Sequence, residues 1–185
     1  LRTEHLLPRF GGGHVAAATA KLARTQELRE LFDASQLAAL FGADEEGAWL
    51  SGEISQDRTP ELRQYLIREL EIPEVTPEAI LQRLDAAFLE RQSDAWILRL
   101  YEFLDGQPAL RQRATALPLI RLSDGKQVTA FTDGQPQAFL PGAFETGFPT
   151  LRPAVCATKA AQSFLRSLGL TDPDPQRCID NHGQR

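Results

Sequence analysis

The sequence predicts an α+β fold, with a mainly helical N-terminal part, a small antiparallel β-meander and a final helix. Apolar side chains recur at helical spacing over the first 105 residues, whereas apolar and polar side chains alternate after residue 117. The charge also changes, because residues 1–105 carry 11 basic and 19 acidic residues and residues 106–185 carry 9 and 6. We therefore expect four parts and leave open whether the middle two share one core: a flexible lead-in (1–14), a helical part (15–105), a β-meander with a C-terminal helix (106–170) and a frayed tail (171–185).

The composition is that of a globular protein large enough to bury a core. The chain has 185 residues, of which 42% are hydrophobic, with ten Phe and two Trp. No run approaches the roughly 20 apolar residues that span a bilayer, and the N-terminus lacks the layout of a signal peptide. We therefore expect a cytoplasmic protein without a membrane partner. The absence of Met and the start at Leu1 indicate a fragment of a longer protein, and the excess of Arg over Lys indicates a bacterial source.

Two helix starts in the helical part use the same device. Thr59-Pro60-Glu61 and Thr76-Pro77-Glu78 each combine a capping hydroxyl, a proline suited to the first helical position and an acidic side chain near the positive end of the helix dipole. Further helices are expected over 15–32, over 35–41 up to Gly42, and from Ser93 or Asp94 as a central core helix. The expected apolar stripes are Leu62, Leu66 and Leu70, then Leu81, Leu84 and Phe88.

The alternating region predicts a hairpin and one further strand. Asp124-Gly125 separates the apolar run 117–122 from the run 128–131, and Asp-Gly accepts the positive φ of a tight turn. A second pair, Asp133-Gly134, precedes the run 138–141, so three short strands are expected. The final helix begins after Thr158 and ends at Gly169 in a left-handed conformation.

Signals for chemistry are weak. Gly11-Gly12-Gly13, flanked by Arg9 and His14, could cradle a phosphate, but neither nucleotide-binding fingerprint is present and a flexible linker is the favoured interpretation. Three well-separated candidate ligands, Cys156, Cys178 and His182, fall short of a structural zinc site, so two free thiols are favoured. The acidic run 44–46 is interpreted as a solvated loop. We therefore expect no catalytic, cofactor-binding or metal-binding residue in this chain.

The charged stretch 57–63 is the candidate interaction surface. Its residues Asp57, Arg58, Glu61 and Arg63, together with the large aromatic Trp49, could contact a partner. The competing interpretation is a capped helix start with local ion pairs of little individual value, and a buried tryptophan.

Several segments resemble large bacterial proteins similar to sacsin and to the plant NO VEIN protein. The similarity covers about residues 22–174, and the order of the segments is more specific than any one of them. The segments are Trp49–Gly52, Ile54–Arg63, Leu117–Gly125, Phe139–Pro141, Phe148–Thr150 with Arg152-Pro153, and Phe164–Thr171.

The resemblance implies a module outside the catalytic domain of its parent. Proteins of this family carry a GHKL-type ATPase domain, the fold shared by gyrase, histidine kinases and heat-shock chaperone ATPases, toward the N-terminus. The Asn-bearing helix and Asp-x-Gly-x-Gly turn that bind ATP are missing here, so ATP and Mg are expected only in that domain. The implied parent is a cytosolic, ATP-dependent, chaperone-like or defence-associated protein. This chain would be a non-catalytic middle module that contacts the ATPase domain of the same polypeptide or protein clients.

Two other function classes make different structural predictions. A nucleic-acid-binding module requires the basic side chains of the second part to gather on one face, and its binding would weaken steeply with salt. The arginines concerned are Arg111, Arg113, Arg121 and Arg152. An unrecognised enzyme would instead bring His, Asp or Arg side chains together in a rigid cleft. The sequence favours the interaction module over both.

Overall fold

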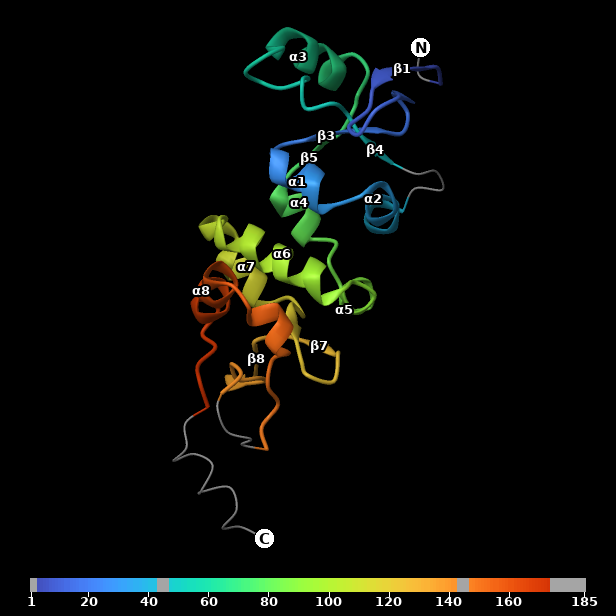
Figure 1. The fold of residues 1–185 in the computed structure, drawn as a ribbon. Helices are drawn as coiled ribbons and strands as arrows, with labels where there is room; N and C mark the ends of the chain where they lie inside the picture. Colours follow the sequence, from blue (N-terminus) through green and yellow to red (C-terminus); the bar gives the residue numbers. More distant parts are fainter. Residues whose placement is uncertain (1–2, 43–46, 143–146, 174–185) are drawn as a thin grey trace. The chain divides into compact units, whose positions relative to one another are not determined.

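The computed structural model describes residues 3–42, 47–142 and 147–173, and it has the expected mixed α+β architecture (Figure 1). The chain divides into two compact units, Leu1–Arg83 and Leu84–Arg185. This division differs from the one expected near Gly106. The central helix α6 (Asp94–Asp105) belongs to the second unit because it packs against the C-terminal helix α8 (Lys159–Ser167).

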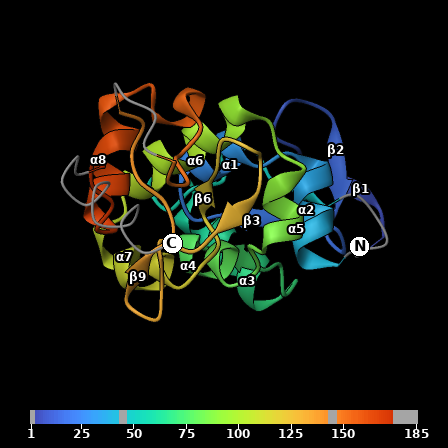
Figure 2. The same ribbon diagram turned by 90° about the horizontal axis from the view of Figure 1, so that it is seen from below.

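The region expected to be a flexible lead-in forms a β-hairpin instead. Strand β1 (His5–Pro8) pairs antiparallel with β2 (His14–Ala16), as the adjacent arrows in Figure 2 show. Gly11, Gly12 and Gly13 all have positive φ, a conformation that side chains disfavour, so the glycine run makes the turn.

Three short parallel strands form the sheet of the first unit. Strand β3 (Ala20–Ala23) lies between β4 (Ala48–Trp49) and β5 (Glu74–Val75), with β4 beside its first half and β5 beside its second half. The helix expected over 15–32 was therefore wrong except at its end. Alanine favours helices in isolation, but pairing on both edges and cover on both faces favour a strand here.

Helices lie on both faces of this sheet. Helices α1 (Gln26–Leu31) and α2 (Ala34–Phe41) connect β3 to β4, and α3 (Pro60–Arg68) connects β4 to β5. Leu22 and Leu66 belong to one buried cluster, so α3 covers that face. The neighbouring strand residue Trp49 reaches the opposite face, where its indole Nε1 donates a hydrogen bond to the Phe32 carbonyl at the end of α1.

Both Thr-Pro helix starts are confirmed. Helix α3 and helix α4 (Pro77–Leu81) begin on their prolines, and the Thr76 hydroxyl accepts a hydrogen bond from the Ala79 N–H. The expected stripe along α3 is only partly present, because Leu66 is buried while Leu62 is 43% exposed. The stripe after Thr76 is divided between α4 and a separate helix, α5 (Ala86–Glu90), in the second unit.

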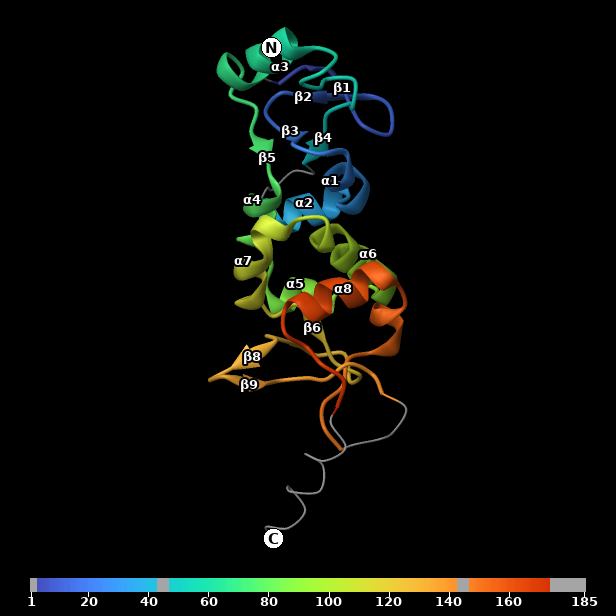
Figure 3. The ribbon, with the colours of Figure 1, turned by 90° about the vertical axis from the view of Figure 1, so that its left-hand side faces the viewer.

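The second unit is built around α6. The side chain of Ser93 caps this helix, and the rings of Tyr101 and Phe164 pack 5.6 Å apart where α8 lies against α6 (Figures 1 and 3). Thr158 caps α8, and Gly169 follows it with a φ of +93°. Shorter elements complete the helical part: the 3₁₀ helices η1 (Pro108–Leu110) and η2 (Pro153–Cys156), and α7 (Arg111–Thr115).

Two separate strand pairs replace the expected three-stranded meander. Strands β6 (Ile120–Arg121) and β7 (Gln127–Val128) form one antiparallel pair, and β8 (Phe131–Thr132) and β9 (Gln135–Pro136) form another, seen as two arrows in Figure 3. Both Asp-Gly turns are confirmed, since Gly125 and Gly134 have positive φ. Among the described residues, no helix is long and apolar enough to cross a membrane.

Candidate functional site

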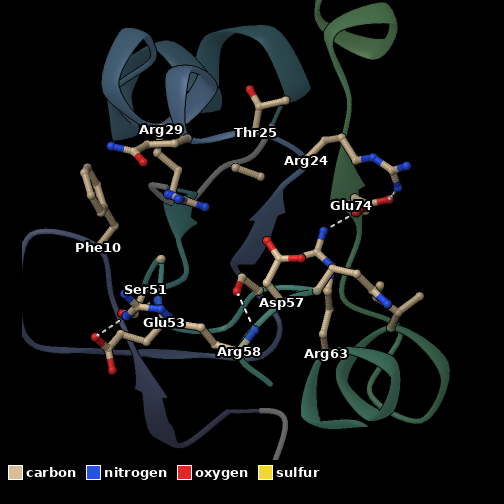
Figure 4. Close-up of a pocket in the computed structure, with 16 residues that line it drawn as sticks. Phe10, Arg24, Thr25, Arg29, Ser51, Glu53, Asp57, Arg58, Arg63 and Glu74 are labelled. Carbon is tan, nitrogen blue, oxygen red and sulfur yellow. Dashed lines mark hydrogen bonds and ion pairs between the residues drawn. The ribbon is translucent and has the colours of Figure 1, made fainter. Parts of the chain in front are cut away.

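A pocket of about 950 Å³ lies in the first unit, at the carboxyl ends of β3 and β4. Its walls come from the end of β3 and the residues directly after it, from the loop 51–58 after β4, from two residues each of α1 and α3, and from single residues of the β1–β2 turn and of β5. Four arginines and three carboxylates line it, as the close-up in Figure 4 shows. The charged residues are Arg24, Arg29, Arg58 and Arg63, with Glu53, Asp57 and Glu74.

Glu74 joins two of the arginines. Its Oε2 lies 3.1 Å from Arg24 Nη1, and its Oε1 pairs with Arg63 Nη2. The pairing of β5 with β3 places Glu74 opposite Leu22, so its carboxylate lies near Arg24, the first residue after β3. Arg63 is only 6% exposed and also donates to the Ile54 carbonyl, so it needs this carboxylate to compensate the loss of water.

Arg58 forms a second and more exposed pair. Its Nη1 lies 3.1 Å from Glu53 Oε1, and both side chains are largely in solvent. The loop that carries them is shaped by Thr59, whose hydroxyl accepts from the Ser55 N–H and donates to the Glu53 carbonyl. The Thr59 side chain therefore holds this loop rather than capping α3, where it makes no capping hydrogen bond.

Arg29 projects from α1 without a carboxylate partner among the described residues. Its Nε is buried and makes no hydrogen bond, and its guanidinium lies over the Phe10 ring at 5.9 Å from the centroid. Burial lowers the pKa of Arg29 and the positive charge of Arg63 lowers it further, while the carboxylates of Glu30 and Glu27 partly oppose this shift. Gly52 lies against this side chain, because a Cβ at Gly52 would be 3.0 Å from Arg29 Nη2.

Thr25 contributes an unused hydroxyl to the same pocket. It occupies the position before α1 where a threonine commonly caps the helix, yet its side chain makes no capping hydrogen bond. Its Oγ1 is buried and has no partner. Two of the residues that line the pocket, Thr25 and Arg29, therefore each have a buried polar atom without a hydrogen bond.

The candidate surface residues divide among different environments. Asp57, Arg58 and Arg63 do line one pocket. Trp49 is corrected, because it is 4% exposed and its indole bonds within the core. Glu61 is exposed in the first turn of α3 and is not part of the pocket wall.

Arg24, Arg29 and Glu74 were not anticipated from the sequence. Arg24 and Arg29 lie close together along the chain, whereas Glu74 is 50 positions from Arg24 and meets it only through the pairing of β3 with β5. The sequence offered one signal for this part of the pocket, the pair Arg24-Thr25 directly before a helix. This pair indicates a site at the end of a strand only once β3 is recognised as a strand.

The basic residues considered for nucleic-acid binding are not all free for that role. Arg121 and Arg152 both pair with Asp94, at 3.1 Å each, and Arg121 also donates to backbone carbonyls. Arg111 and Arg113 lie exposed on α7. Two of the four arginines thus hold the second unit together.

The remaining sequence candidates can be placed in part. His5, Arg9 and His14 line a second pocket of about 510 Å³ beside the β1–β2 hairpin. Cys156 is a buried free thiol. Cys178, His182 and the acidic run 44–46 all lie outside the described residues. Within the described part of the chain, no group of three or more His, Cys, Asp or Glu side chains could hold a metal ion.

No protein-family model matches this chain, and neither does any curated protein or solved structure. The function is therefore argued from the residues of the first unit.

Proposed function

We propose that this chain is a non-catalytic interaction module of a large, cytosolic, sacsin-like or NO VEIN-like protein that carries an ATPase domain outside this chain. Its partner is the ATPase domain of the same polypeptide, and protein clients are further partners. The observation that carries the proposal is the exposed apolar surface of the first unit, above all Leu62 and Tyr65 on α3.

These two side chains share one face of α3. They are three residues apart and are 43% and 49% exposed, while Arg63 and Leu66 on the same helix are buried. Single exposed apolar residues are ordinary, but a leucine and a tyrosine on neighbouring helical positions favour contact with another surface. Tyrosine is also among the residue types that contribute most to protein interfaces.

The neighbouring pocket supports a binding role as well. Phe10 and Ile67 line it and are exposed, and they lie among arginines. Aromatic residues and arginine are enriched at protein interfaces relative to the rest of the surface. Arginine stays protonated and therefore does not serve as a general base, and two of the three carboxylates, Glu53 and Glu74, are in ion pairs.

The test is a titration of the full chain against the isolated ATPase domain of its parent, with ATP hydrolysis measured for each alone and for the mixture. We expect the chain alone to be inert and to bind the ATPase domain or change its rate. The double variant Leu62→Ser, Tyr65→Ser should weaken binding at least about tenfold, because two exposed apolar anchors are lost.

A matched control removes an equally exposed aromatic residue elsewhere. Phe131 is 38% exposed in the second unit, so Phe131→Ser should leave the affinity unchanged. Turnover of ATP by the chain alone would contradict the proposal, as would an affinity that the double variant leaves intact.

A further inference from the structure

The charges of the first-unit pocket do not balance. Glu74 is shared by Arg24 and Arg63, and Glu53 pairs with Arg58, whereas Arg29 makes no ion pair among the described residues and has only Glu30 and Glu27 of its own helix nearby. With Asp57 as the third carboxylate, the lining has four arginines against three carboxylates, an excess of one positive charge.

We propose that this pocket binds the phosphate group of a small ligand, with the Arg29 guanidinium as the principal anchor. This proposal goes beyond the partner contact above and does not depend on it. The phosphate oxygens accept hydrogen bonds from the Arg29 guanidinium, and the negative charge of the ligand relieves the repulsion between Arg29 and Arg63.

Several directions of approach favour a phosphate over a carboxylate. Arg29 comes from α1, Arg24 from the end of β3 and Arg63 from α3, so guanidinium groups surround the pocket from more than one side (Figure 4). A planar carboxylate is satisfied by one guanidinium fork, whereas a phosphate offers oxygens in three dimensions and a charge close to −2. A convergent set of arginines therefore suits a phosphate better.

The position in the fold supports a small-molecule site. The strand order β4-β3-β5 means that the chain leaves β3 toward one edge and returns to its other edge, so the strand order reverses at β3. In open parallel sheets, ligands bind outside the carboxyl ends of the strands at such a reversal. The pocket lies at the carboxyl ends of β3 and β4, and its volume leaves room for a group attached to the phosphate.

Gly52 provides the space that this geometry needs. A methyl group at this position would lie 3.0 Å from Arg29 Nη2 and would push the guanidinium away. The substitution adds one methyl group and no charge, and it keeps an arginine at position 29. Gly52→Ala therefore tests the position of the guanidinium rather than its charge.

The experiment uses the full chain, labelled with ¹⁵N, and titrates it with inorganic phosphate, with glycerol phosphate and with acetate at constant ionic strength. We expect saturable shifts of the Thr25 and Gly52 amides and of Arg29 Nε with both phosphates, and much weaker shifts with acetate. Tighter binding of glycerol phosphate would identify an esterified ligand, and equal binding would identify free phosphate; both outcomes support the site.

Variants distinguish binding at this pocket from nonspecific attraction of phosphate to the positive charge of the protein. Arg29→Gln should weaken phosphate binding at least about tenfold, as the loss of a charge-assisted hydrogen bond does, and Gly52→Ala should weaken it several-fold. The matched control is Arg68→Gln, which removes the same charge from an exposed position on α3 outside the pocket and should change nothing. Circular dichroism confirms that each variant is folded.

Three results would overturn the assignment. They are the absence of saturable phosphate binding at millimolar concentration, acetate binding as tight as phosphate, and equal weakening by Arg29→Gln and Arg68→Gln. None of them bears on the contact made by Leu62 and Tyr65, which lie outside the pocket and are tested separately by their double variant.

Discussion

Arg29 and Arg63 illustrate how the surroundings of a guanidinium decide its role. Arg63 is buried, paired with Glu74 and bonded to a carbonyl, so it serves the structure of the first unit. Arg29 is half-buried with an unsatisfied Nε and no carboxylate partner among the described residues. The sequence singled out the first of these arginines and missed the second, because only the strand pairing shows which of them is left without compensation.

Cys156 carries a prediction about reactivity. Burial raises the pKa of its thiol to about 11, so at pH 8 only about one molecule in a thousand carries the reactive thiolate. We expect iodoacetamide to label Cys156 slowly in the native protein and rapidly after denaturation, as measured by mass spectrometry on a Cys178→Ser variant. Labelling of the native protein at the rate of free cysteine would contradict the burial of this thiol.

The same pKa shift has a consequence for stability. The unfolded thiol ionises near pH 8.5, below the folded one, so the unfolded state loses its proton first. The contribution of Cys156 to stability is therefore complete below about pH 8 and declines as the pH rises toward 11. The Cys156→Ala variant should lose this decline.

At the scale of elements, helix starts were easier to predict than strands. Thr76-Pro77 and Ser93 act through local hydrogen bonds, so the sequence alone identified the helices that follow them. Strand β3 has an alanine-rich sequence, and β4 and β5 are two residues long. Their structure depends on pairing with distant segments, which local periodicity does not reveal.

Asp94 links three elements of the second unit. It lies in the first turn of α6 and pairs with Arg121 of β6 and with Arg152 before η2. Arg121 is buried, so Asp94→Ala leaves its charge without a counter-charge, and we expect the free energy of unfolding to fall by about 3 kcal/mol. Urea unfolding followed by circular dichroism measures this loss.

The control for Asp94 is an exposed ion pair in the same unit. Asp124 pairs with Lys126 at 3.2 Å, and both side chains are largely in solvent. Asp124→Ala should therefore cost much less than Asp94→Ala, because solvent screens the exposed pair. If both variants lowered the free energy of unfolding equally, the burial of Arg121 would not make its ion pair with Asp94 more important than an exposed pair.

At the scale of the whole molecule, the sequence anticipated the fold class but not the division of the chain. The change of charge near Gly106 drew attention to the end of α6, yet charge follows the solvated surface and says little about which residues share a core. The sequence likewise identified only part of the candidate site. The stretch 57–63 supplies part of the pocket, and long-range pairing supplies the rest.

The last prediction follows from the positions of the two tryptophans. Trp49 is buried in the first unit and Trp96 in the second, and the first unit contains a buried cluster of its own. The variants Trp49→Phe and Trp96→Phe therefore leave a single fluorescent reporter in one unit at a time. We expect the two reporters to show different urea midpoints, because the parts of a chain that open as compact units do so with different free energies.

Each reporter variant also needs a reference. Circular dichroism of each variant should show both transitions, so that any shift caused by the substitution itself is seen directly. Trp49→Phe removes the hydrogen bond to the Phe32 carbonyl and should lower the midpoint of the first unit alone. A single transition shared by both reporters, with both midpoints lowered together by Trp49→Phe, would instead mean that the chain folds as one cooperative unit.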